Sequence, residues 1–518
     1  MKAPEILGRR AAVVALCLGS MLLYIDFGTT SVESVAAKKE TSPASKHTRS
    51  TADRWPMWGD GPGRNMANRH AKNLPYRWDV ETGENIKWKA PLGSQSYGNP
   101  VVGDGRVLIG TNNEGKRNPA ITDDKGIVMC FRQSDGKFLW QAVHDKLSSN
   151  KVNDWPEQGI CSTGVVENGK YYYVSNRAEL VCADLEGFKD GENDGPYRDE
   201  KYTSSIDGDF IWILDMINEY GVFPHNLATS SPLIIGDLVY INTSNGVERD
   251  HITVPNPRAP SFIAVNKNTG ELAWESNEPG EGILHGQWSC PTWIRAAGKE
   301  QILFPGGDGW LYSFEPKKGE LLWKFDLNPK DAKWELGGLG TRNNILSTAV
   351  AVGDTVYLAV GQDPEHLEGI GHLYSINAAG AKGDVTKTAQ NWHYGGEDYR
   401  RTVSTVAATD DGLLYAADLS GFLHCLDAKT GKKYWIHDTL AAIWGSPTVI
   451  DGKVFLGDED GDIVVLKHGK VRKVLAEMNM GHTVYSTPVA VGDTLYITNR
   501  RTLFAISTTG RPKSSNEE

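Results

Sequence analysis

Polar and aromatic side chains gather in the short segments that precede eight similar apolar strands, and these are the residues that could do chemistry. Where several such segments converge, their amide, imidazole, guanidinium and carboxylate groups can bind a polar small molecule or a peptide. The alternative is that they only hydrogen-bond one another and ordered water in a polar channel. The candidate ligand- or cofactor-binding residues, with no catalytic residue among them, are Gln158, His225, Asn226, His285, Gln287, Trp288, Arg342, Asn343, Glu397, Asp398, Arg401, Trp444 and Tyr485.

An acidic stretch, DGENDGPYRDE at residues 190–200, is a candidate metal site. Asp190, Glu192 and Asp194 alternate ahead of a glycine as the oxygen ligands of a calcium loop do. Lys201 stands where such a loop would carry its bidentate glutamate, so the match is incomplete. The stretch is therefore either a calcium site or a plain acidic surface turn. None of the six cysteines is adjacent to another or forms a Cys-x-x-Cys pair, which excludes a c-type haem site and a four-cysteine zinc site.

Eight copies of one sequence unit must position these residues. Each copy runs from small residues or proline into an apolar strand, a glycine turn and further strands, and many copies close on Thr-Gly or Asp-Gly followed by tryptophan. The copies begin at Gly98, Ser162, Ser230, Ser289, Ser347, Ser404, Gly445 and Ser486. A repeat of four short antiparallel strands with glycine turns is typical of a β-propeller. We therefore predict an all-β, eight-bladed propeller of four-stranded antiparallel blades.

The last copy ends without a fourth strand, although a propeller must close to avoid an unpaired strand edge. An isolated apolar segment ahead of the first copy, NIKWKAPL at residues 85–92, carries a tryptophan as outer strands do. We predict that this N-terminal strand completes the last blade. The recurring tryptophan and Thr-Gly positions are interpreted as packing between blades, and the long loops of one face as the place for binding residues.

The chain divides into four predicted parts. Residues 1–36 combine Lys2, Arg9 and Arg10 with an apolar run and small residues, which indicates a signal peptide or an N-terminal anchor. Residues 37–54 are predicted to be a flexible linker, residues 55–507 the propeller, and residues 508–518 a disordered tail. The net charge of −11 argues against nucleic acid as a partner. We expect export across the inner membrane to the periplasm or cell envelope, with membrane association if the anchor is retained.

The units ending in SFEPKKGELLW (residues 313–323) and CLDAKTGKKYW (residues 425–435) resemble the tryptophan-docking repeats of the pyrroloquinoline quinone (PQQ) enzyme superfamily. The span from about Trp55 to Ser507 resembles the secreted PQQ-binding-like β-propeller repeat proteins, which are related to BamB. For true quinoprotein dehydrogenases, the resemblance implies PQQ over a vicinal disulfide, a calcium ion and a catalytic aspartate. This chain lacks adjacent cysteines, so no catalytic residue is carried over.

Three functions remain open at this point. The first is an extracytoplasmic binding or scaffold protein whose loop-rich face takes an envelope protein or a small polar ligand. The second is an atypical PQQ-dependent oxidoreductase, with PQQ and calcium as cofactors, in which arginines would pair with the PQQ carboxylates. Its expected PQQ neighbours are Arg342, Glu397, Asp398, Arg401 and Trp444. The third is a polysaccharide-binding or polysaccharide-active propeller in which Trp155, Trp288 and Trp444 would stack on sugars.

Overall fold

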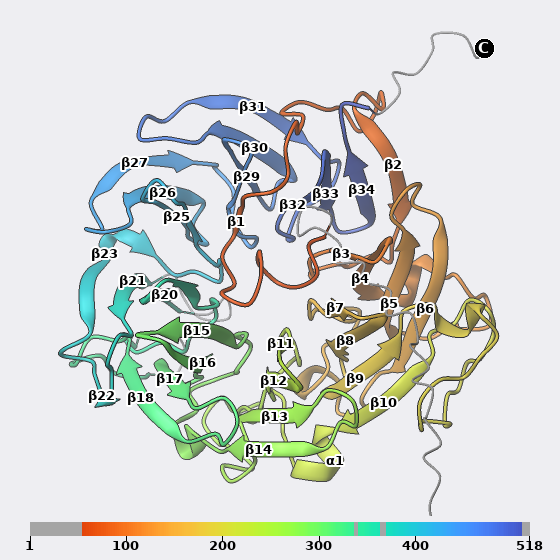
Figure 1. Cartoon of the computed structure of the whole chain (residues 1–518), viewed down its shortest axis with the longest axis horizontal. Coiled ribbons are helices and arrows are strands. Elements are labelled where there is room, and N and C mark those ends of the chain that lie inside the picture. The colour runs from red at the N-terminus through yellow and green to blue at the C-terminus, as the bar shows by residue number, and fades with distance from the viewer. Residues whose placement is uncertain (1–53, 336–339, 363–368, 510–518) are drawn as a thin grey trace, which may run out of the picture. The chain divides into compact units, whose positions relative to one another are not determined.

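Eight small antiparallel sheets stand in a ring around a common centre in the computed structural model of the chain (Figure 1). The structure describes residues 54–335, 340–362 and 369–509. Every sheet contains four antiparallel blade strands, which confirms the predicted eight-bladed propeller. Within the described residues, no helix is both long and apolar enough to span a membrane.

The blades follow one another in chain order, each from its innermost to its outermost strand. The first two blades hold β3 (Val101–Gly103), β4 (Arg106–Asn112), β5 (Lys125–Arg132), β6 (Phe138–Asp145), β7 (Val165–Glu167), β8 (Lys170–Val174), β9 (Glu179–Asp184) and β10 (Phe210–Asp215). The third and fourth hold β11 (Leu233–Ile235), β12 (Leu238–Asn242), β13 (Phe262–Asn266), β14 (Leu272–Ser276), β15 (Thr292–Ala296), β16 (Lys299–Pro305), β17 (Trp310–Phe314) and β18 (Leu321–Asp326).

The fifth and sixth blades hold β19 (Val350–Val352), β20 (Thr355–Val360), β21 (Ile370–Asn377), β23 (Gln390–Arg400), β24 (Ala407–Ala408), β25 (Leu413–Ala417), β26 (Phe422–Asp427) and β27 (Lys433–Asp438). The seventh and eighth hold β28 (Thr448–Ile450), β29 (Lys453–Gly457), β30 (Asp462–Lys467), β31 (Val474–Asn479), β32 (Val489–Val491), β33 (Thr494–Thr498), β34 (Thr502–Ile506) and β2 (Ile86–Pro91). Two short strands, β1 (Ala67–Asn68) and β22 (Gly383–Asp384), add parallel edges to the seventh and fourth blades. The loops carry one short helix, α1 (Met216–Tyr220), and 3-10 turns at Asn113–Gly115, Asn150–Val152, Gly187–Lys189 and Gly280–Gly282.

In seven of the eight blades, a turn that contains glycine forms a two-residue hairpin between the first and second strands. In the third blade Ile235 pairs with Leu238, and the first residue between them, Gly236, has φ of 61°. In the first blade the two turn residues are Asp104 and Gly105, both with positive φ. Turns with left-handed residues match the twist of antiparallel strands, which is why the repeat keeps glycine there.

A tryptophan in the outermost strand docks six of the blades onto their successors. Its indole Nε1 donates a hydrogen bond of 2.7–3.1 Å to a carbonyl just after the third strand of the next blade. The six are Trp88, Trp140, Trp212, Trp274, Trp392 and Trp435. In the receiving turn of the fourth blade, a Cβ on Gly319 would lie 2.5 Å from the ring of Trp274. The tryptophan and Thr-Gly positions therefore serve the packing between blades.

The N-terminal strand closes the ring as the sequence predicts. Strand β2 pairs antiparallel with β34, so the last blade takes its outermost strand from the beginning of the propeller. Trp88 of β2 then docks onto the first blade, where its Nε1 donates to Gln133 O at 3.1 Å. Strand pairing on one side and tryptophan docking on the other join the eighth blade to the first.

The residues ahead of β2 occupy the centre of the ring, which the sequence did not indicate. Residues 55–68, here called the axial segment, run across the centre of the ring (orange in Figure 1) and contact the innermost strand of each blade, or the residues directly before it. Backbone pairs at 2.8–3.0 Å join the segment to blades 1, 2, 4, 5 and 7 through Val102, Val166, Trp293, Ala351 and Val449. Side chains of Arg64, Asn65 and Asn68 reach carbonyls of blades 3, 6 and 8 at Pro232, Ala408 and Ala490.

Some predicted parts lie outside the described residues. These are the signal segment at residues 1–36, nearly all of the linker at 37–54, and the tail beyond residue 509. Their assignment stays a prediction.

Candidate functional site

A cavity of about 490 Å³ opens at the centre of the ring, and we call it the funnel. Its wall takes at least one described residue from the segment entering every blade, and its floor includes Trp58 of the axial segment. None of the described residues lining it is charged. The lining is Trp58, Tyr97, Trp155, Gln158, Cys161, Thr163, Asn226, Leu227, Thr229, Ser231, Trp288, Cys290, Leu346, Thr348, Val403, Trp444 and Tyr485. A concave, largely apolar site with a few polar groups has the character of a ligand site.

Aromatic rings hold one another in place around the funnel wall. Tyr97 and Tyr485 stack with ring centroids 4.8 Å apart, and Trp444 meets Tyr485 edge-on at 5.5 Å. Trp288 is fixed by its indole N–H, which donates to the carbonyls of His225 and Leu227 at 3.2 and 3.1 Å. Burial raises the pKa of the Tyr97 hydroxyl, so this phenol stays neutral near neutral pH. The wall is therefore rigid, aromatic and uncharged.

The structure brings five of the candidates into the funnel and puts the other eight elsewhere. Gln158, Asn226, Trp288, Trp444 and Tyr485 line the cavity. The remaining candidates do not line the cavity. This division depends on side-chain direction, which the order of segments in the sequence does not give.

Three of the remaining candidates lie behind the wall of the third and fourth blades. The rings of His225 and His285 lie with centroids 4.3 Å apart, in contact with a third histidine that the sequence reasoning missed, His251. Gln287 is buried and donates to Asn245 O and Ser261 Oγ, both at 2.8 Å, so it braces the adjacent loop. His251 lies in the middle of the long loop between β12 and β13, away from the segments that precede the blades.

The charged candidates do not line the funnel. Arg342 forms an ion pair with Asp326 at 3.1 Å, and the N–H of Asn343 donates to Asn328 Oδ1 at 2.8 Å. Arg401 is half-buried and does not line the cavity. Glu397 and Asp398 lie within strand β23, not in a connecting segment, because β23 continues its pairing with β21 as far as Ile370↔Arg400. Both are exposed, and Asp398 pairs with Lys433.

The acidic stretch gathers a slightly different set of carboxylates from the one expected. Asp190 and Asp194 lie with Asp184, with one carboxylate oxygen from each within 4.8 Å of the others. Glu192 is exposed and is not part of this group, although its backbone N–H donates to Asp190 Oδ1. Exposed acidic groups gather without an ion as well, so calcium at this place stays a prediction.

A family profile described as outer membrane protein assembly factor BamB matches residues 224–363 and 384–516, slightly more than half of the chain. The chain belongs to this family.

The relatives of this BamB-family chain fall into two groups. BamB of Yersinia pestis is 23% identical over 386 residues, which cover 73% of this chain and 79% of that protein. The quinoprotein ethanol dehydrogenase of Pseudomonas aeruginosa is 28% identical over 184 residues, 32% of this chain but only 26% of that protein. The chain is thus a BamB-like propeller that also has quinoprotein dehydrogenase relatives.

Solved structures share the fold at low identity. BamB from Moraxella catarrhalis superposes with a TM-score of 0.51 and 13% identity, covering 81% of this chain and 98% of that one. A europium-containing methanol dehydrogenase gives a TM-score of 0.58 and 13% identity, with coverage of 88% and 98%. These likenesses establish the architecture and leave the ligand open.

The donor groups of the BamB-family funnel do not fit the cofactors that quinoprotein relatives imply. PQQ carries carboxylates, which call for cationic partners, and calcium calls for carboxylate oxygens, but the described lining is uncharged. The five cysteines in the described residues are all free, so none supplies a vicinal disulfide. Arg342, an expected PQQ partner, is paired with Asp326. We therefore derive no chemistry through PQQ.

A buried aspartate in the turn between β16 and β17 gives a testable dependence on pH. Burial raises the pKa of Asp308 to about 6, while Tyr312 donates to its carboxylate at 2.6 Å. Because this pKa is higher in the folded state than in the unfolded chain, Asp308 favours folding at low pH. That contribution is lost as the pH rises from about 4 through about 6.

We expect Asp308→Asn to raise the free energy of unfolding by about 1–3 kcal/mol at pH 8, because asparagine cannot ionise. At pH 4 the gain should vanish, since the native carboxyl is then protonated. Urea unfolding of both proteins across this pH range measures the difference. Asp331→Asn, at an exposed loop position, is the matched control. An Asp308→Asn effect of equal size at both pH values would contradict the assignment.

Proposed function

We propose that this protein is a binding scaffold of the cell envelope, and that its funnel holds an uncharged, largely apolar segment of a partner protein. The observation that carries the proposal is the uncharged aromatic lining, to which all eight blades contribute. A volume of about 490 Å³ lies within the usual range for ligand sites. Aromatic rings held rigidly at the centre of a pocket contribute strongly to protein–protein recognition.

The family supports a role as a protein-binding platform. The profile and the Yersinia relative both carry the description of an outer membrane protein assembly factor. The predicted signal segment at residues 1–36 would export this chain across the inner membrane, to the side that faces the outer membrane. We infer that its partner is an envelope protein and that its activity is binding.

Binding should depend on the aromatic wall. We expect Trp444→Ala to weaken binding of a peptide with alternating aromatic residues by about tenfold to a hundredfold, the range for a buried aromatic anchor. Isothermal titration of the full propeller with a panel of uncharged aromatic peptides and their acidic counterparts measures the effect. Trp310→Ala, at a half-buried tryptophan of β17 that does not line the funnel, is the matched control. Equal affinity for Trp444→Ala and the native protein, or preference for acidic peptides, would refute the proposal.

A neutral polysaccharide is the second candidate ligand. One observation favours it: Trp155, Trp288 and Trp444, the three expected sugar-stacking residues, line the same cavity together with the amides of Gln158 and Asn226. Amphipathic rings offer flat apolar faces, and amides can pair with hydroxyl groups. The same titration with neutral oligosaccharides decides between the two, because binding of a sugar without binding of any peptide would select the second candidate.

A further inference from the structure

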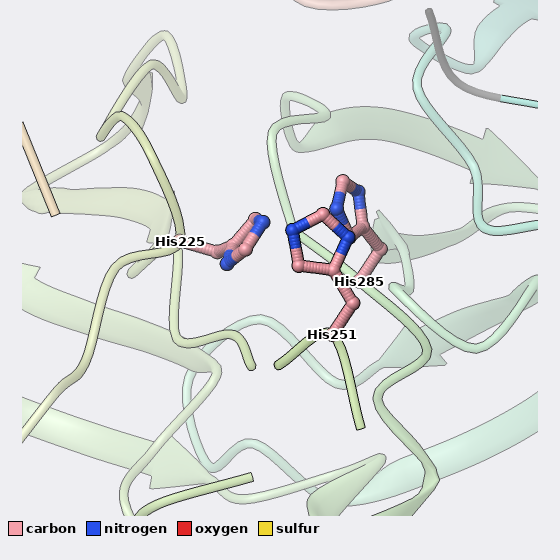
Figure 2. A group of neighbouring side chains, drawn as sticks. All are labelled: His225, His251 and His285. Carbon is pink, nitrogen blue, oxygen red and sulfur yellow. The ribbon is translucent and has the colours of Figure 1, made fainter. Parts of the chain in front are cut away.

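Three histidines from three separate segments meet next to the funnel. His225 precedes β11, His251 lies in the loop between β12 and β13, and His285 precedes β15. One ring nitrogen from each lies within 4.8 Å of the other two, and the ring centroids are 4.3, 4.7 and 4.9 Å apart. Figure 2 shows His225 facing the other two imidazoles across a small gap.

This spacing is close to what one metal ion requires. Imidazole nitrogens bind zinc at about 2.0–2.1 Å, which puts two nitrogens of a tetrahedral site about 3.3 Å apart. The three rings therefore need to approach one another by no more than about 1.5 Å, within the reach of small side-chain rotations. Neutral imidazole suits zinc, copper and nickel, so the donor set selects a divalent transition metal over calcium or magnesium.

Val247 contacts both His225 and His285 through its backbone, and it orients the ring of His225. His225 Nδ1 donates to Val247 O at 2.8 Å, which leaves the lone pair of this imidazole on Nε2. The N–H of the same Val247 donates to His285 O at 3.2 Å. A carbonyl partner on the second ring nitrogen is the usual way in which a protein orients a metal-binding histidine.

Two unusual backbone positions bring the third ring inward. A Cβ at Gly246 would lie 2.6 Å from His225 Cβ and 3.0 Å from His285 O, so only glycine lets this loop pass between them. His251 has φ of 58°, a left-handed conformation that is uncommon outside glycine. Strained residues of this kind persist where the surroundings require them and concentrate at functional sites.

One side of the cluster opens to solvent. A cleft of about 570 Å³ is lined by His225 and His251 together with Lys151, Trp155, Asn226 and Arg249. Three protein ligands with an open side are the pattern of an exchangeable or catalytic metal site, whereas structural sites are closed by four. Lys151 and Arg249 give the cleft a positive wall, which suits an anionic co-ligand such as a carboxylate or phosphate.

From this geometry we propose that His225, His251 and His285 form a three-histidine site for a divalent transition metal, open to the cleft that Lys151 and Arg249 line. Trp288 lies 5.4 Å from His285 between ring centroids and lines the funnel, so a bound metal would stand directly behind the funnel wall. The site is independent of the peptide-binding role proposed above.

Metal titration of the full propeller, first treated with a chelator, tests the site. With Zn²⁺, we expect one ion per chain by equilibrium dialysis. With Co²⁺, we expect visible absorption bands of a four- or five-coordinate ion and quenching of tryptophan fluorescence through Trp288. His251→Gly, which keeps the left-handed backbone while removing the ligand, should weaken binding at least a hundredfold.

His70→Ala, at an exposed histidine elsewhere in the chain, is the matched control and should leave affinity unchanged. Circular dichroism of His251→Gly establishes that the propeller is still folded, so that loss of metal is not loss of structure. Failure of the native protein to bind Zn²⁺, Co²⁺, Ni²⁺ or Cu²⁺ at stoichiometric concentration would overturn the proposal. Binding that persists in His251→Gly would overturn it as well.

Discussion

Replacing Arg64 with alanine is expected to lower the free energy of unfolding by about 4 kcal/mol, because buried carbonyls are left without a donor. The Arg64 side chain is fully buried in the axial segment. Its guanidinium donates to Pro291 O and Pro232 O at 2.8 Å, and to Ser231 O and Trp58 O at 3.1 Å. Burial lowers the pKa of Arg64 to about 10, so the group is still charged at neutral pH.

Guanidinium chloride unfolding, followed by circular dichroism, measures the loss. Arg64→Lys keeps the charge but not the planar fork of donors, so it should recover less than half of the free energy of unfolding that Arg64→Ala loses. Arg69→Ala, at an exposed arginine paired with Asp410, should cost less than about 0.5 kcal/mol. Limited proteolysis gives a second readout, since Arg64→Ala should make residues 55–68 the earliest site of cleavage within the propeller. An Arg64→Ala protein as stable and as resistant as Arg69→Ala would contradict the assigned role.

Removing the Trp88 side chain should cost about 3–5 kcal/mol, as for other buried tryptophans. Trp88 is 8% exposed, covers Gly136 of the first blade and packs against Tyr496 at 5.9 Å. Its blade takes the outermost strand from the beginning of the propeller, with β2 paired to β34, so the joint between Trp88 and the first blade closes the ring. We therefore expect Trp88→Ala to open that joint ahead of global unfolding.

Native-state proteolysis distinguishes opening of the joint from general destabilisation. In Trp88→Ala, cleavage within the propeller should begin between residues 55 and 92. Trp274→Ala removes an equally docked ring from blades that the chain joins directly, so it should lower stability without exposing this region. Trp88→Phe keeps most of the apolar contact and should lose about 1 kcal/mol for the missing hydrogen bond. The same cleavage pattern in both alanine variants would show that the joint is no weaker than the others.

The ring and its closure could be predicted because they repeat. Each blade shows the same strands and turns, and Trp88 stands out as an outer-strand tryptophan without its own blade. The axial segment could not be predicted, since its residues follow no period and five of the eight blades bind it through backbone groups that any sequence possesses. Arg64 offers no signal in the sequence either, because a buried arginine is recognised only when its carbonyl partners are known.

Only part of the candidate site could be anticipated. Trp288, Trp444 and Tyr485 line one cavity. Glu397 and Asp398 instead lie within strand β23. Arg342 was expected there too, but Asp326, sixteen residues earlier, takes its guanidinium. His251 belongs to a loop whose path is set by Gly246 and Val247, so its meeting with His285 depends on tertiary contacts. The order of the strands can be predicted from the local sequence pattern, whereas the direction of each side chain depends on tertiary packing.

The axial segment and β2 together determine when the propeller ring can close during folding. Strands β3 to β34 emerge in order and can pair as they are made, but the eighth blade needs β34 beside β2, the last described strand beside one of the first. Until then the incomplete sheet exposes two edges that could pair with other chains. Arg64 must also reach carbonyls of blades 3 and 4 at the centre. The axial segment is synthesised before any of the blades, so it acquires its full set of contacts only after those blades have formed. Ring closure is thus a late, non-local step, and molecules stalled before it are the ones most exposed to aggregation.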